Sequence, residues 1–359
     1  MNINRSPTLP RGFCFLPELG ADFQLRPIFN SFGDLTHGEL FFPNLGGVSV
    51  VKAPISDIKF WAAENNAGLC ALINTLSERV ARPSKTFAGL SLAEPVLMGV
   101  LNVTPDSFHD GGQFDDHDTA VSHGKRLINA GAEIVDIGGE STRPGAQPIS
   151  VQEEVDRVLP VIEQLAAEDV LIAVDTRRAS VMREALAAGA VIVNDVTALR
   201  GDPQMASVIS QSGCSVILMY SKDETARTSL KDKKYDDVIR TIHEFFEERL
   251  EFVESRGILS ENIMLDPGMG HFISSDPQYS FEIIRRFSEF GILNKPLLIG
   301  PSRKSFLAKV SPGIELATNA RDFPCAVVCS IALWHGAKVL RMHEVVQGRQ
   351  ILDTLSCIG

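Results

Sequence analysis

The chain has 359 residues, 44% of them hydrophobic, and a formal net charge of −11 at pH 7. A single α/β domain can run to about 250 residues, so this length suits one large domain with roughly 90 residues to spare. The acidic balance argues against a general electrostatic attraction to nucleic acid. No apolar run approaches the ~20 residues of a membrane span, and the N-terminal stretch MNINRSPTLPRGF lacks the apolar core of a signal peptide.

The cysteines favour a reducing compartment. None of the six stands in a CxxC or zinc-type spacing: Cys14, Cys70, Cys214, Cys325, Cys329 and Cys357. Cys325 and Cys329 lie four residues apart on a predicted helix, which is typical of small apolar core residues. We therefore expect a cytoplasmic location.

Residues 1–92 differ in composition from the rest and are rich in Phe, Pro and Gly up to position 54. Strand-like runs at 12–17 and 46–51 precede a helical stretch at 55–79, and 82–95 reads as a linker. Polar side chains do not converge anywhere in this segment. We therefore expect a small mixed α/β extension that serves packing or assembly rather than chemistry.

From residue 93 to 359, short β-branched runs alternate with amphipathic helical stretches. The runs are at 96–103, 133–139, 170–176, 191–196, 215–220, 262–266, 296–300 and 338–343. Continuous apolar runs are typical of strands that helices cover on both faces. Eight βα units predict an α/β fold, a (β/α)8 TIM barrel that carries a small N-terminal α+β extension. The alternative is a doubly wound sheet, which would more often have a glycine fingerprint after its first strand.

Polar side chains follow these runs at the points where the predicted strands end. They are Asn102, Glu140, Asp175, Asn194, Asp195, Tyr220, Asp266, the stretch from Gly300 to Ser302, Arg303 and Lys304, and finally Arg341 and His343. Chain direction places these ends on one rim of a barrel, and that rim carries the chemistry in such enzymes. A single Asp or Asn after a strand can instead cap the next helix, but capping does not explain eight ends that behave alike.

One group of these residues suits a flat heterocycle with several ring N–H and carbonyl groups. Asp175 and Asp266 can accept hydrogen bonds from ring N–H and amino groups. Lys304 and the Asn194 amide can donate to a carbonyl or a ring nitrogen. The pattern therefore predicts a heterocycle pocket.

A second group suits a phosphate or diphosphate, because Thr142, Arg143, Arg341 and His343 are all hydrogen-bond donors. Asn102 offers an oxygen to a hard metal ion. Mg²⁺ keeps most of its waters and bridges to phosphate oxygens, so one protein ligand is sufficient. The site is therefore predicted to take a heterocycle, a diphosphate and Mg²⁺.

Two loops beside this rim, 102–114 and 139–150, are rich in Gly, Pro, Ser and Asp. Both exceed the usual two to six residues of a βα loop. Loops that close over a reactive intermediate need such turn-rich hinges. We expect both to border the active site.

These residues resemble one known family, dihydropteroate synthase. The resemblance covers about 96–346 and rests on LNVTPDSF (101–108), GGESTRPGA (138–146), VDT (174–176), NDV (194–196), LDPGMG (265–270), SRKSFL (302–307) and RMH (341–343). The strings occur in the order and spacing of the family, and residues 1–92 lie outside it.

The resemblance implies a transferase of folate biosynthesis. Such an enzyme condenses 6-hydroxymethyl-7,8-dihydropterin diphosphate with 4-aminobenzoate and forms 7,8-dihydropteroate and diphosphate. Carried over by position, it implies pterin contacts from Asp175, Asn194, Asp266 and Lys304, and diphosphate contacts from Thr142, Arg143, Arg341 and His343. It also implies Mg²⁺ on Asn102, and an aminobenzoate pocket formed by Ser302, Arg303 and the region of Phe272. Asp106 would order the arylamine, and Gly300 would be a further substrate-binding residue.

The chain departs from the family pattern in two places. MYSKD (219–223) stands where the family usually has MHMQG, and 269–280 stands where it has a Gly-Phe-Gly-Lys stretch. Both segments border the predicted aminobenzoate pocket, and they are similar to strings of sulfonamide-resistant synthases. We therefore hypothesise reduced sulfonamide sensitivity, with ordinary loop drift as the alternative.

Two other functions and the oligomeric state stay open at this point. A pterin-dependent methyltransferase would share the pterin ligands but has no use for a diphosphate site. A non-catalytic pterin-binding accessory protein of folate synthesis would not need every chemical role filled. The apolar stretch at 325–339 is compatible with a core helix or with a homodimer interface.

Overall fold

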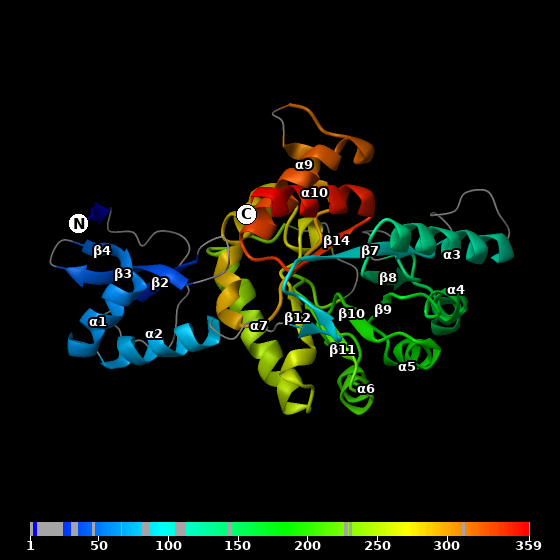
Figure 1. Ribbon diagram of the computed structural model, residues 1–359, viewed down its shortest axis with the longest axis horizontal. Helices are drawn as coiled ribbons and strands as arrows, with labels where there is room; N and C mark the ends of the chain where they lie inside the picture. Colours follow the sequence, from blue (N-terminus) through cyan, green and yellow to red (C-terminus); the bar gives the residue numbers. More distant parts are fainter. Residues whose placement is uncertain are drawn as a thin grey trace.

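The computed structural model contains a parallel sheet surrounded by helices, with a smaller body formed by the N-terminal segment (Figure 1). The residues that it describes are 3–5, 24–29, 35–44, 47–65, 67–80, 86–104, 113–141, 146–225, 229, 232–310 and 313–358. All statements below concern these residues.

All eight predicted runs are strands of one parallel sheet. They are β7 (Val96–Asn102), β8 (Ile134–Gly138), β9 (Leu171–Asp175), β10 (Ile192–Asp195), β11 (Ser215–Met219), β12 (Ile263–Asp266), β13 (Leu298–Ile299) and β14 (Val339–Met342). The sheet runs in the order β12-β11-β10-β9-β8-β7-β14-β13. At its open edge Leu265 bridges Leu297 in parallel, and the Leu265 amide donates to the Pro296 carbonyl at 3.0 Å. This bridge closes the sheet into a TIM barrel, so the doubly wound alternative is wrong.

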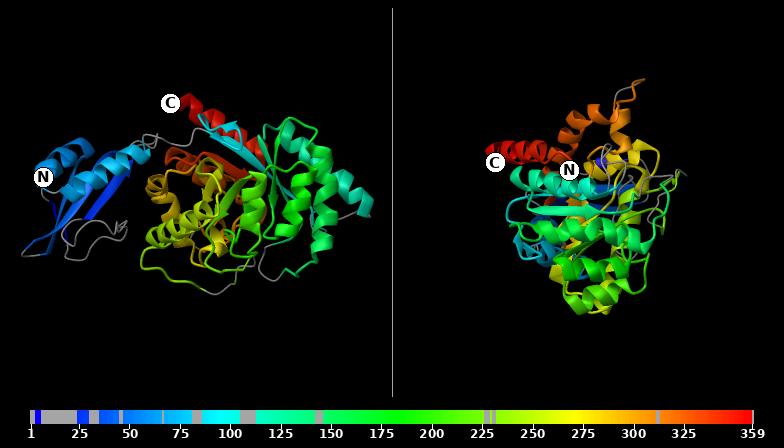
Figure 2. Two further views of the ribbon diagram at one scale, coloured as in Figure 1. Left: turned by 90° about the horizontal axis from the view of Figure 1, so that it is seen from below. Right: turned by 90° about the vertical axis from the view of Figure 1, so that its right-hand side faces the viewer.

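Helices connect the strands and cover the outside of the barrel (Figures 1 and 2). They are α3 (Gln113–Asn129), α4 (Val151–Leu165), α5 (Ala179–Ala188), α6 (Met205–Ser212), α7 (Val238–Ser255), α8 (Pro277–Arg285), α9 (Asp322–Trp334) and α10 (Val345–Ile358). Local sequence fixes several ends: Asp237 caps the first amides of α7, and Gly189 ends α5 in a left-handed conformation. Cys325 and Cys329 are buried on α9, as predicted.

Short 3-10 turns shape the loops of the second half of the barrel. They are η2 (Ser260–Asn262), η3 (Gly270–Phe272), η4 (Phe287–Leu293), η5 (Ser305–Lys309) and η6 (Thr318–Ala320). Two of them matter for the site, because η3 follows β12 and η5 follows β13 on the rim where the strands end.

The N-terminal segment contains an antiparallel sheet and two helices (Figure 2). The strands β1 (Ile3–Arg5), β2 (Gln24–Phe29), β3 (Leu35–Asn44) and β4 (Gly47–Pro54) pair in the order β1-β4-β3-β2. The predicted helical stretch consists of α1 (Ile55–Asn65) and α2 (Ala67–Val80). Their core, with Leu25, Ile58 and Leu69, includes Ile292 of η4, so the segment packs on the barrel near α7. The run predicted at 12–17 lies outside the described residues.

The stretch read as a linker contains a hairpin that completes the barrel. The strands β5 (Thr86–Phe87) and β6 (Leu90–Ser91) join through Ala88 and Gly89, both at positive φ. Phe87 is 1% exposed and packs with Leu92 into the apolar interior of the barrel. The linker interpretation was therefore wrong for these residues. Phe87 fills the interior at the end of the barrel where the strands begin, opposite the rim where they end.

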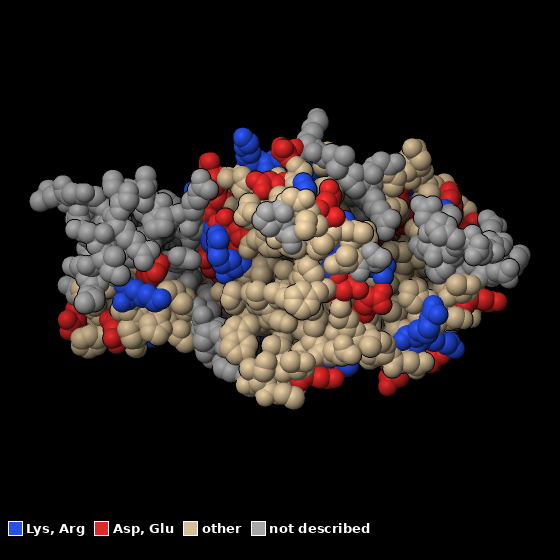
Figure 3. All heavy atoms as spheres, turned by 90° about the horizontal axis from the view of Figure 1, so that it is seen from above, with Lys and Arg blue, Asp and Glu red and all other residues tan. Residues whose placement is uncertain are grey.

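The surface shows no extended field of one charge on the face in Figure 3, where acidic and basic side chains are interspersed among other residues. Within the described part of the chain, none of the helices is both long and apolar enough to cross a membrane.

Candidate active site

Alternate side chains of each strand point into the barrel, because successive residues of a strand face opposite sides. The lower interior layer is apolar and consists of Met98, Ile134, Ala173, Ile192, Ile217, Met264, Leu298 and Val339. The layer above it lies two residues further along each strand: Val100, Asp136, Asp175, Asn194, Met219, Asp266, Gly300 and Arg341. We call this second set the polar layer. The polar layer forms the bottom of the site at the strand-end rim, where the sequence predicts the chemistry.

Arg341 links the carboxylates of the polar layer. Its Nε lies 2.7 Å from Asp136 Oδ2, and its Nη2 lies 2.6 Å from that oxygen and 3.1 Å from Asp175 Oδ2. The Asn194 amide also donates to Asp136 Oδ2, at 3.0 Å. The structure therefore brings together three of the predicted residues, Asp175, Asn194 and Arg341, around one buried carboxylate.

Lys304 reaches the same layer from the segment between β13 and η5. Its Nζ lies 4.7 Å from the centre of the Phe272 ring, in the range of a cation–π contact. Asp266, at the end of β12, accepts a hydrogen bond from the Gly268 amide at 2.8 Å. The Phe272 ring packs against Val196 and Met219. An aromatic wall thus stands beside the ammonium group.

Burial and neighbouring charge shift the pKa values of these groups. Burial and the charge of Asp136 raise the pKa of Asp175 to about 7, against the opposing effect of Arg341. Burial raises the pKa of Asp266 as well, although Lys304 lowers it. Burial lowers the pKa of Lys304 to about 8, against Asp266. The ionised forms of Asp175 and Lys304 are therefore both less favoured than in water, and both groups titrate nearer to neutral pH.

Ser302 and His343 form a pair on the rim. Ser302 Oγ lies 3.1 Å from His343 Nδ1 and accepts the His343 amide at 3.3 Å. Arg303 has a φ of 61° and an exposed side chain that pairs with Glu344. Gly300 lies beside Arg341, and a Cβ on it would be in ordinary contact with Arg341 Cβ at 3.6 Å. Gly300 thus belongs to the polar layer, Ser302 and His343 form a pair on the rim after it, and the Arg303 side chain is exposed beside Glu344.

The sequence of this barrel matches the family model described as pterin binding enzyme over residues 98–343. The chain belongs to the pterin binding enzyme family. Its relatives place it among the dihydropteroate synthases. It is 41% identical to the dihydropteroate synthase of Escherichia coli K12 over 260 residues, which are 71% of this chain and 89% of that protein. It is 38% identical to that of Bacillus subtilis over 262 residues, 72% of this chain and 87% of the relative.

A longer relative joins two activities. The chain is 43% identical over 251 residues to a probable bifunctional folylpolyglutamate synthase/dihydropteroate synthase of Haloferax volcanii. Those residues are 69% of this chain but only 29% of that protein. The match therefore covers under a third of the bifunctional protein, and the family assignment rests on the relatives that are matched over most of their length.

A solved structure agrees with the fold and the family. The dihydropteroate synthase of Xanthomonas albilineans with 4-aminobenzoic acid aligns with a TM-score of 0.70 and 36% identity, over 76% of this chain and 96% of that one. This dihydropteroate synthase is thus a TIM-barrel transferase, and the pterin-dependent methyltransferase alternative is not supported by its relatives.

The structure reveals one site residue that the sequence analysis missed, Asp136. It is fully buried on β8, and its Oδ1 atom has no hydrogen-bond partner among the described residues. Sequence reasoning took Glu140 as the polar residue of this strand, but Glu140 pairs with Arg177 and Arg178 instead. The available signal was an isolated Asp within an apolar strand, two residues after Ile134.

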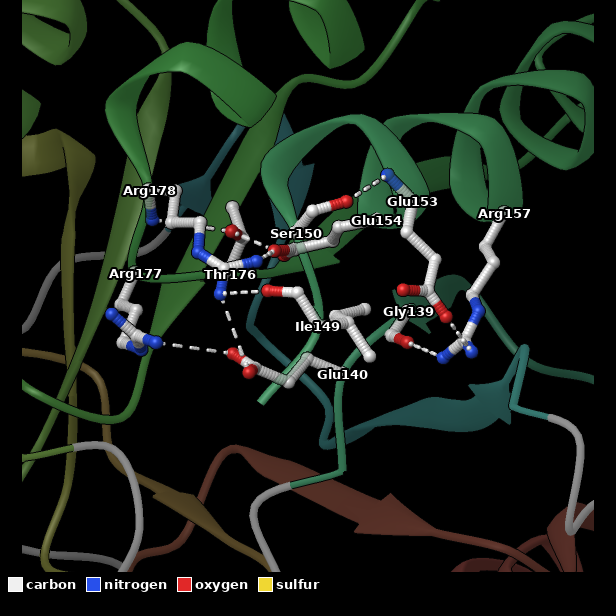
Figure 4. Close-up of polar contacts among 10 residues, drawn as sticks. All are labelled: Gly139, Glu140, Ile149, Ser150, Glu153, Glu154, Arg157, Thr176, Arg177 and Arg178. Carbon is white, nitrogen blue, oxygen red and sulfur yellow. Dashed lines mark hydrogen bonds and ion pairs between the residues drawn. The ribbon is translucent and has the colours of Figure 1, made fainter. Parts of the chain in front are cut away.

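Glu140 belongs to a network that holds the described ends of the loop after β8 (Figure 4). Arg178 contacts Glu140 and the buried Glu154, and donates to the Ile149 carbonyl at 2.8 Å. Thr176 Oγ1 donates to Glu154 at 2.7 Å. The network ties the start and the end of this loop to β9 and α4. Thr142 and Arg143, like Asp106, lie outside the described residues.

Asn102 lies at the end of β7, one layer above Val100, and is half-buried. Its Oδ1 atom would lie 3.7 Å from a Cβ on Gly138, and its amide has no hydrogen-bonded partner in the described part of the chain. The described residues contain no group of three or more His, Cys, Asp or Glu that could hold a metal. A lone amide oxygen fits Mg²⁺, which takes its other ligands from water and phosphate.

Asp195 follows Asn194 but has a structural role. Its carboxylate accepts the Thr197 amide at 2.8 Å and the Leu199 amide at 2.9 Å. Both Ala198 and Leu199 have positive φ values. The side chain therefore stabilises a strained turn after β10. It does not cap the next helix, because the N-cap residue of α6 is Gln204.

Proposed function

We propose how this dihydropteroate synthase binds its substrates: the polar layer holds the pterin ring of 6-hydroxymethyl-7,8-dihydropterin diphosphate. Asp136, Asp175 and Asp266 accept its N–H groups, and Lys304 and Asn194 donate to its carbonyl and ring nitrogen. The observation that carries this proposal is the polar layer itself, since five of its eight positions bear hydrogen-bonding side chains directed at one space. Thr142, Arg143, Arg341 and His343 take the diphosphate, as the family resemblance implies.

The chemistry requires charge stabilisation more than a strong base. The bond between the exocyclic methylene carbon and the diphosphate oxygen breaks, and the positive charge left on carbon spreads into the pterin. Asp175 stabilises that charge while Arg341 and His343 stabilise the departing diphosphate. The 4-aminobenzoate nitrogen then bonds to the methylene carbon and releases its proton to solvent. Asp106 orders the arylamine, and Phe272, Ser302 and Arg303 line its pocket.

Asn102 would hold Mg²⁺ in this site. The ion, when bound, neutralises charge on the leaving diphosphate. Diphosphate release measured with and without each component tests the whole assignment. Release that needs both substrates and Mg²⁺ is the expected result. Intact pterin binding without any turnover would instead favour the non-catalytic accessory protein.

Reduced sulfonamide sensitivity is a further proposal for the second-substrate pocket. Phe272 packs against Val196 and Met219, and Lys304 Nζ lies 4.7 Å from the centre of its ring. A ring confined in this way cannot readily change its rotamer to make room for the sulfonyl substituent of a sulfonamide, which is larger than the carboxylate of 4-aminobenzoate. We expect the sulfamethoxazole Ki to exceed the 4-aminobenzoate KM by at least about tenfold, or ~1.4 kcal/mol. The E. coli enzyme serves as the control, and a Ki at or below that KM would refute the proposal.

A homodimer through α9 is the assembly that we propose. One face of α9 is buried on the barrel, whereas Phe323, Val327, Ile331 and Trp334 are 79%, 45%, 40% and 43% exposed. Their spacing places these apolar side chains on one stripe, which a second copy would bury. The double change Val327→Asp and Ile331→Asp should convert a dimer into a monomer in sedimentation, while Leu259→Asp, at another exposed apolar position, should not. A monomeric wild-type chain would contradict the proposal.

A further inference from the structure

A buried lysine stands in one of the two segments that depart from the family pattern. The Lys222 side chain is 3% exposed. Its Nζ donates to the Ser229 carbonyl at 2.6 Å and to the His271 carbonyl at 2.5 Å, and lies 3.5 Å from Asp223 Oδ2. Burying an ammonium group is costly unless it is paired, so these contacts define a built structural position rather than a surface charge.

Groups from the part of the chain that follows β11 donate hydrogen bonds to three consecutive carbonyls of the loop after β12. Lys222 Nζ donates a hydrogen bond to the His271 carbonyl, and the Lys222 backbone amide donates one to the Phe272 carbonyl at 2.8 Å. The Tyr235 hydroxyl donates a hydrogen bond to the Ile273 carbonyl, also at 2.8 Å. The backbone on both sides of Phe272 is therefore held by hydrogen bonds from Lys222 and Tyr235, which both lie between β11 and α7 in the chain.

The two loops also contact each other at two further points. Gly268 has a φ of 71°, and a Cβ there would lie 2.4 Å from the Tyr220 carbonyl oxygen. Ser274 Oγ donates to the Lys233 carbonyl at 3.0 Å. With its backbone held, the Phe272 ring stays beside Lys304, at the border between the polar layer and the proposed aminobenzoate pocket.

We infer that Lys222 is a positioning residue that sets the affinity for the arylamine substrate, because it fixes the backbone of Phe272 from behind. This inference rests on the proposed function, in which Phe272 lines the aminobenzoate pocket. Lys222 itself touches neither substrate. It acts through Phe272, so its loss weakens arylamine binding and leaves pterin binding in place.

Steady-state kinetics of the full chain tests this with Lys222→Met, which keeps the length of the side chain but removes its charge and donors. The KM for 4-aminobenzoate should rise at least about tenfold, the scale of losing a hydrogen bond from a charged donor. The KM for the pterin diphosphate should stay within about twofold, since the polar layer is intact. Lys234→Met is the matched control, because Lys234 is an exposed lysine of the same segment; it should leave both values unchanged.

A double mutant shows whether Lys222 acts through Phe272. In a Phe272→Ala background, Lys222→Met should raise the 4-aminobenzoate KM no further, whereas independent effects would multiply. An unchanged KM, an equal rise in both KM values, or multiplying effects would each overturn the inference. A wild-type chain without turnover would instead refute the proposed function.

Discussion

Lys304→Ala is expected to abolish pterin binding and to lower kcat/KM by about three orders of magnitude, equivalent to about 4 kcal/mol. The change removes a buried charged donor that reaches the polar layer. It also removes the cation that lowers the pKa of Asp266. Asp266 would then take up a proton more readily and lose part of its capacity to accept a hydrogen bond from the pterin.

Titration calorimetry with the pterin substrate and continuous measurement of diphosphate release check this result. Lys309→Ala is the matched control, since Lys309 lies five residues further along and is exposed at the end of η5. That variant should keep near-native kcat/KM. A near-native kcat/KM in Lys304→Ala would show that the heterocycle pocket has been assigned to the wrong residues.

The barrel strands could be predicted from sequence because their physical signal is local. A strand covered by helices on both faces must be apolar along its whole length, and all eight such runs are strands. The residues at the strand ends followed from chain direction alone. The sequence could therefore place four residues of the polar layer at the rim without knowledge of the strand register: Asp175, Asn194, Asp266 and Arg341.

Other features depend on register or on distant partners. Asp136 lies inside a strand rather than at its end, and its contacts with Arg341 and Asn194 from other strands show that it belongs to the polar layer. The segment 221–237 reads as a charged loop, yet Lys222 is buried because it meets a carbonyl 49 residues away. The hairpin with Phe87 was missed because its strands have two residues each.

Asp136→Asn should lower kcat/KM for the pterin diphosphate by about two orders of magnitude at neutral pH, equivalent to about 2.7 kcal/mol. Asp136 is the shared acceptor of Arg341 and Asn194. An amide in its place cannot balance the Arg341 charge, and its NH₂ group can face the guanidinium. Asp156→Asn is the control, because it neutralises an exposed carboxylate of α4.

The pH profile of this variant gives a sharper test than its rate. In the wild type, Asp136 helps to raise the pKa of Asp175 to about 7, while Arg341 lowers it. Once the charge of Asp136 is removed, Arg341 acts on Asp175 without that opposition, so the pKa of Asp175 must fall. Burial lowers the pKa of Lys304 to about 8, and the charged groups that also shift this pKa are Asp266, Arg341 and Asp175, not Asp136.

The kcat/KM profile reports the free enzyme, so its two limbs follow Asp175 and Lys304. Activity in the wild type should fall below about pH 7, where Asp175 gains a proton, and above about pH 8, where Lys304 loses one. In Asp136→Asn the acid limb should move to lower pH while the alkaline limb stays in place. An acid limb that stays or moves upward would mean that Asp136 and Asp175 do not share the charge of Arg341.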